Sequence, residues 1–179
     1  MDESASSRSI KRTQVILWLA FMADPLASVA LLLVWRSTQG DRMVEGAASC
    51  PGWAAYLFAV LLAAASVFVR RLLLSERLVM TRLESGKSES DVLPMPGNLG
   101  ARDEWLWRLS HWYLTPMLIA WGLNSLVTVG GLICLFTEGD EMPVIILSLA
   151  ALVLNALAYP RFERFVERIE GLSQGWEGI

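Results

Sequence analysis

One carboxylate stands inside a long apolar segment of this chain, and it is the residue with the strongest claim to chemistry. The segment runs from Val15 to Trp35, and Asp24 lies near its middle, directly before Pro25. Its 21 residues would reach about 31 Å as a helix, which is enough to cross the hydrocarbon core of a bilayer. An Asp at the centre of such a helix costs about 3 kcal/mol on insertion scales. Asp24 is therefore expected to face protein or water rather than lipid.

The sequence leaves two interpretations of Asp24 open. It could be a structural acid that hydrogen-bonds to Asn124, Thr128 or Asn155 in other apolar segments. It could also carry protons or cations, because an acid inside a span is functional by default and Pro25, which has no N–H, leaves a backbone carbonyl free nearby. Asn124 and Asn155 complete this predicted ion or proton site, with helix packing as their alternative role.

Other residue types that could do chemistry are sparse. His111 is the single histidine, which is too few for a bis-His haem site or a His-rich metal site. Cys50 and Cys134 are both expected near the outer face of the membrane, where a disulfide could form, and unpaired packing cysteines are the alternative. The sequence contains no Cys-x-x-Cys, His-Glu-x-x-His, Gly-x-Ser-x-Gly or phosphate-binding Gly-rich loop. We therefore predict no metal, no cofactor and no enzymatic activity.

The composition is that of an integral membrane protein. The 179 residues are 54% hydrophobic and 18% charged, whereas about a quarter of the residues in a soluble protein are charged. The basic residues lie outside the apolar segments and form no single face that nucleic acid could use. The sequence predicts the lipid bilayer as a partner and excludes nucleic acid.

The elements that position these residues follow from the apolar segments. We predict an all-α fold with one membrane domain over residues 15–172, a four-helix transmembrane bundle with cytoplasmic helical extensions. The predicted spans are residues 15–35, 53–69, 113–136 and 143–159, with a polar tail at 1–14, a linker at 70–112 and a flexible C-terminus at 173–179. Small or polar residues recur along one face of each span, which favours close packing of the helices.

The distribution of Lys and Arg predicts the orientation. Thirteen of the 15 lie in the tail, the linker or the segment after residue 159, and the other two are Arg36 and Arg42. By the positive-inside rule, both termini and the linker are cytoplasmic. The predicted location is the plasma membrane, the inner membrane of a bacterium, with several passes.

Two charged segments should extend the spans. Apolar residues recur at helical spacing from the second span to Leu83, so that helix is expected to continue past the membrane. Residues 102–112 place Trp105, Leu109 and Trp112 on one helical face, which is typical of a short helix at the level of the lipid headgroups.

A helix after the fourth span carries an apolar seam formed by Phe162, Phe165, Ile169 and Leu172. This seam could bind a second copy of the chain or a partner membrane subunit, or it could pack within the chain on residues 70–84. The sequence therefore favours a non-catalytic accessory or interaction module of a membrane complex or homo-oligomer. The alternative is a proton- or cation-coupled transporter or channel subunit that uses Asp24.

Overall fold

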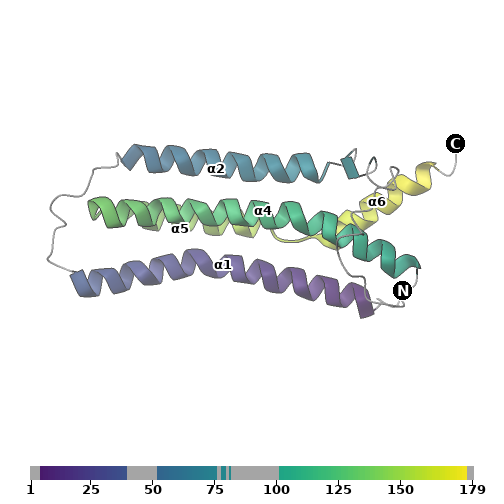
Figure 1. The fold of residues 1–179 in the computed structure, drawn as a ribbon, viewed down its shortest axis with the longest axis horizontal. Coiled ribbons are helices and arrows are strands. Elements are labelled where there is room, and N and C mark those ends of the chain that lie inside the picture. The colour runs from purple at the N-terminus through teal and green to yellow at the C-terminus, as the bar shows by residue number, and fades with distance from the viewer. Residues whose placement is uncertain (1–4, 40–51, 76–77, 80, 82–100, 177–179) are drawn as a thin grey trace.

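A computed structural model describes residues 5–39, 52–75, 78–79, 81 and 101–176. Within these ranges the chain is all-α and has five helices (Figure 1). They are α1 (Ala5–Gln39), α2 (Gly52–Leu73), α4 (Ala101–Glu138), α5 (Met142–Leu157) and α6 (Phe162–Trp176). The predicted all-α class is thus confirmed.

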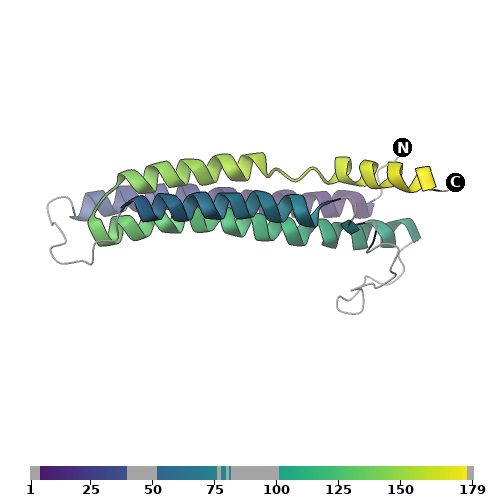
Figure 2. The ribbon, with the colours of Figure 1, turned by 90° about the horizontal axis from the view of Figure 1, so that it is seen from above.

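Four of these helices lie side by side as a bundle, with α4 at the centre (Figures 1 and 2). α4 contacts α1, α2, α5 and α6. In Figure 1, α5 lies behind α4, and α1 and α2 flank this pair on opposite sides. α1 and α4 begin at the same end of the bundle, where α6 also lies, and the turn between α4 and α5 is at the other end.

Three helices are long and apolar enough to cross a membrane, over Arg8–Thr38, Trp53–Leu73 and Arg102–Glu138. A fourth candidate is the pair α5 and α6, which is bent by 41° at the break between them. α5 alone has 16 residues and reaches about 24 Å, less than the roughly 30 Å of the hydrocarbon core. The chain is thus a candidate multi-pass membrane protein with three or four spans.

The helical extensions of the apolar segments agree with the prediction only in part. α2 ends at Leu73, and residues 78, 79 and 81 are helical again, so the predicted extension of the second span is interrupted after Leu73. α1 already begins at Ala5, inside the predicted polar tail. Residues 102–112 form the first turns of the continuous 38-residue α4 and not a separate helix. The physical reason is that lengthening an existing helix needs no new nucleus. Residues 173–176, expected to be flexible, form the end of α6.

α4 and α5 approach each other closely at Gly131. A Cβ on this residue would lie 2.9 Å from both the carbonyl oxygen of Pro143 and the Cα of Val144. Real Cβ atoms are not found that close to backbone atoms, so only glycine allows this packing. Gly131 belongs to the small-residue face expected for the third span, and its role is to let two backbones touch.

The end of α5 is held by side chains from three other helices. The Nε1–H of Trp18 in α1 donates to the Asn155 carbonyl at 2.8 Å, and the Nε1–H of Trp121 in α4 donates to the Ala158 carbonyl at 3.0 Å. Arg70 in α2 donates to the Leu157 carbonyl at 3.2 Å. The last carbonyls of a helix have no intrahelical partner, and lipid supplies none. These three donors allow α5 to end inside the bundle.

Candidate functional site

Asp24 lies half-buried on α1 and faces α4. Its Oδ2 is 3.2 Å from the Oγ1 of Thr128, and its backbone carbonyl accepts a hydrogen bond from Ser28 Oγ, also at 3.2 Å. Thr128 was one of three neighbours that the sequence offered for Asp24. The structure brings Asp24 to Thr128, while Asn124 pairs elsewhere.

The hydroxyl of Thr128 has two possible acceptors for its one proton. Its Oγ1 is 2.7 Å from the Ser125 carbonyl as well as 3.2 Å from Asp24 Oδ2. A hydroxyl has a single proton, so it cannot donate fully to both oxygens. The hydroxyl of Ser125 is also buried and has no hydrogen-bond partner within the described residues. We refer to Asp24, Thr128 and Ser125 as the acidic corner, a place where polar groups are incompletely paired.

Asn155 on α5 is the centre of a second polar cluster, which joins three helices. Its Nδ2 donates to the Phe21 carbonyl on α1 at 3.1 Å, and its Oδ1 accepts a hydrogen bond from Asn124 Nδ2 on α4 at 2.9 Å. Its backbone carbonyl accepts the bond from Trp18. Asn155 and Asn124 are fully buried. The two amides that the sequence placed in an ion site therefore hold helices together.

The carbonyl that Pro25 leaves without its helical partner is that of Phe21, four residues earlier. Because Asn155 donates to this oxygen, the expectation of a free carbonyl beside Asp24 is wrong. The physical reason is that a backbone acceptor buried between apolar helices needs a donor, and α5 supplies one.

The seam residues of α6 point into the protein. Phe162, Phe165 and Ile169 are buried together with Leu109 and Tyr113 of α4. The ring centroids of Phe162 and Phe165 lie 5.5 Å and 5.1 Å from that of Tyr113. The fourth seam residue, Leu172, lies in α6, but its side chain is outside the described residues. Packing within the chain thus occupies this face, on α4 and also on Val79, which belongs to the 70–84 segment that the sequence offered as a partner.

The predicted disulfide between Cys50 and Cys134 stays a prediction, because Cys50 lies outside the described residues. Cys134 is buried on α4 beside Ala55 and Leu147. His111 lies against Trp107 of its own helix, with ring centroids 3.6 Å apart and the ring planes tilted by 47°. No group of three or more His, Cys, Asp or Glu side chains that could hold a metal ion occurs in the described part of the chain.

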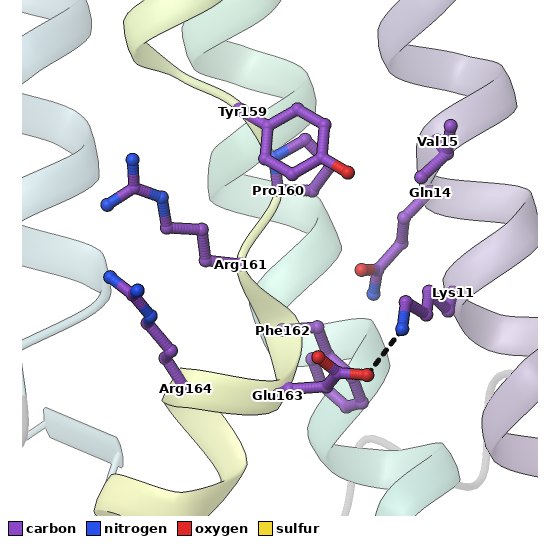
Figure 3. A pocket seen from close by; sticks show the side chains of 9 residues that line it. All are labelled: Lys11, Gln14, Val15, Tyr159, Pro160, Arg161, Phe162, Glu163 and Arg164. Carbon is purple, nitrogen blue, oxygen red and sulfur yellow. Dashed lines mark hydrogen bonds and ion pairs between the residues drawn. The ribbon is translucent and has the colours of Figure 1, made fainter.

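A polar pocket that the sequence interpretation missed lies beside the break between α5 and α6. It is lined by residues of α1 and by residues 159–164, and Figure 3 shows it from close by. Its signal in the sequence is weak, since Lys11 and Gln14 merely precede the apolar run that begins at Val15.

Comparison with known proteins assigns this chain to no family. No protein-family model, curated protein or solved structure matches this chain. The geometry of the acidic corner, the Asn155 cluster and the pocket is therefore the basis for a function.

Proposed function

We propose that this chain is a small multi-span membrane protein with a non-catalytic role, a fixed bundle that serves as an accessory or interaction module. The observation that carries the proposal is the position of Asn155. Its side chain and backbone accept or donate three hydrogen bonds, to Trp18, Phe21 and Asn124, and these tie α1, α4 and α5 together. Alternating access requires one group of helices to rock against another, and this cluster opposes such movement.

α2 packs on α4 along one side and leaves most of its apolar surface outside the bundle. Only 11% of the apolar window of α2 is buried inside the protein, compared with 50% for α4. Large side chains such as Leu61, Val67 and Phe68 point outward from α2. This face replaces the seam of α6 as the surface on which a second copy of the chain could pack within the bilayer.

Native mass spectrometry of the full chain, released from bilayer nanodiscs, tests this role. We expect a dimer or larger assembly, and Leu61→Ala and Phe68→Ala should weaken it, so that on dilution they dissociate already at a higher protein concentration than the wild type does. Leu33→Ala on α1 is the matched control, because Leu33 is also exposed but lies on another helix. A strictly monomeric wild type would remove the support for self-association through α2.

The acidic corner supports a second candidate function, proton- or cation-coupled transport. The observation in its favour is that the Thr128 hydroxyl faces two oxygens with one proton. If it donates this proton to the Ser125 carbonyl, its oxygen and the Asp24 carboxylate oxygen can lie in contact only with a proton on the carboxyl group or a cation between the two oxygens. Such a site could load and release a charge only if the corner opens to water on both sides.

Asp24→Asn separates the two functions, because it retains size and hydrogen-bonding capacity while removing the charge. The module predicts no proton or cation flux in proteoliposomes from either the wild type or the variant. Transport predicts flux from the wild type that Asp24→Asn abolishes, with an unchanged melting temperature. Flux in the wild type would overturn the module as the primary function.

A further inference from the structure

A polar pocket of about 380 Å³ opens where α1 passes the break between α5 and α6. In Figure 3, Lys11 and Gln14 reach from α1 toward residues 159–164, which form the opposite wall. The pocket lies at the end of the bundle where α1 begins, just outside the apolar run that starts at Val15. The edge-to-face pair of Trp18 and Tyr159, with ring centroids 5.0 Å apart, lies on its apolar side. Aromatic rings of this kind mark the level of the lipid headgroups.

Gln14 is the residue in this pocket that indicates a ligand. The residue is only 3% exposed, and its Nε2 is buried with no hydrogen-bond acceptor among the described residues. Leaving a buried amide donor unpaired destabilises the folded protein. An acceptor from outside the chain would remove this destabilisation.

The charges around the pocket favour an anionic acceptor. Three cations, Lys11, Arg161 and Arg164, line it together with one carboxylate, Glu163. Glu163 Oε1 is 2.5 Å from Lys11 Nζ, so these two charges compensate each other and the excess positive charge of the lining comes from Arg161 and Arg164. In Figure 3, Arg161 and Arg164 extend from the side of the α5–α6 connection that faces away from Lys11 and Gln14. The two arginines therefore raise the positive potential in the pocket, while Lys11 and Gln14 are placed to contact an anion directly.

The first turn of the 15-residue α6 adds backbone donors to the same wall. The first N–H groups of a helix have no intrahelical acceptor, and this end carries the positive end of the helix dipole. The N–H of Arg161 is already used, because it donates to the Tyr113 hydroxyl at 2.8 Å. The next N–H groups, those of Phe162, Glu163 and Arg164, are the ones that can bind an anion.

We propose that this pocket binds the phosphate of an anionic phospholipid headgroup through Gln14, Lys11 and the first turn of α6. A phosphate offers several acceptor oxygens to convergent donors and a charge that matches the cationic lining. The exposed side chains of Ile16 and Leu19 continue along α1 from this level and give the acyl chains an apolar surface. A soluble phosphate ester has the same binding chemistry but lacks the acyl chains.

The test is native mass spectrometry of the full chain in a neutral detergent, titrated with phosphatidylglycerol or phosphatidylcholine. We expect phosphatidylglycerol to bind more tightly, and Gln14→Leu to weaken it about tenfold, as for the loss of one hydrogen bond to a charged group. Lys11→Gln should weaken it to a similar extent. Arg36→Gln removes the same charge at the opposite end of α1 and should leave binding unchanged.

Competition with sn-glycerol 3-phosphate distinguishes the two sources of phosphate. The proposal expects this soluble ester to displace phosphatidylglycerol only at far higher concentration, and equal potency would assign the site to a soluble ligand and overturn the lipid. Without lipid, Gln14→Leu should unfold at the same temperature as the wild type or higher, since it removes an unpaired buried donor. Equal binding of the two lipids, or full binding by a folded Gln14→Leu, would overturn the site.

Discussion

Asn155 donates its Nδ2–H to the carbonyl of Phe21, at 3.1 Å, and this carbonyl is the one that Pro25 leaves without an intrahelical donor. A defect in one helix is thus corrected by a side chain of another. Because the same amide accepts the bond from Asn124, the repair also joins the central helix. The bundle gains a specific register between α1, α4 and α5 from a single buried residue.

Asn155→Leu should destabilise the bundle by about 2 kcal/mol, because it leaves the Phe21 carbonyl and the Asn124 amide unpaired in a buried site. Pro25→Ala restores a backbone N–H that can bond to the Phe21 carbonyl. We therefore expect Asn155→Leu to cost less in the Pro25→Ala background than in the wild type. Thermal or denaturant unfolding of the four proteins in detergent measures this coupling, and strictly additive effects would contradict the repair.

Gly131→Ala should destabilise the chain by about 1–3 kcal/mol, the usual cost of overpacking. The added methyl group would meet the backbone of Pro143 and Val144 at 2.9 Å, and a backbone cannot move aside as a side chain can. Gly122→Ala on the same helix is the control, since a Cβ there meets nothing within 4 Å. That variant should gain about 1 kcal/mol from helix propensity. Melting temperatures that shift equally in both variants would refute the close approach of α4 and α5.

Tyr113→Phe should loosen the junction between α5 and α6 while leaving the bundle folded. It removes the hydroxyl that accepts the Arg161 N–H at 2.8 Å, at a cost of about 1 kcal/mol, but keeps the ring against Phe162 and Phe165. Hydrogen exchange should become faster at the start of α6 and stay unchanged in α5. Tyr159→Phe is the control, because Tyr159 contacts Trp18 through its ring.

Trp121→Phe should destabilise the C-terminal end of α5. The Ala158 carbonyl loses the indole N–H that lies 3.0 Å away, and no water reaches a fully buried position to replace it. We expect a loss of about 1–3 kcal/mol in unfolding free energy. Trp53→Phe makes the same chemical change at an exposed position of α2 and should be neutral within about 0.5 kcal/mol. Equal effects of the two substitutions would show that the indole bond does not hold α5.

The membrane character and the main helices could be predicted from the sequence, because hydropathy and length are local properties of a segment. The limits of the helices could not all be predicted, since α2 stops at Leu73 without any breaker, and α4 runs straight through the segment expected to lie at the surface. For the seam of α6, the spacing correctly predicted an apolar face. The sequence left open whether a second chain or residues 70–84 covers it, and the structure shows packing within the chain, in a cluster that contains Val79 and also residues of α4. Periodicity identifies an apolar face and does not identify what covers it.

Asp24, Asn124 and Asn155 were recognisable from the sequence alone as polar groups that lipid would not solvate, because charge and amide groups in apolar helices are costly wherever they lie. Only the tertiary structure decided their partners. Asn124 and Thr128 are one turn apart on α4, about 6 Å along its axis. How far α1 and α5 are shifted along α4 therefore decides that Asp24 meets Thr128 and that Asn155 meets Asn124. That shift depends on the close approach at Gly131 and on side chains from distant parts of the chain, and no local pattern encodes it.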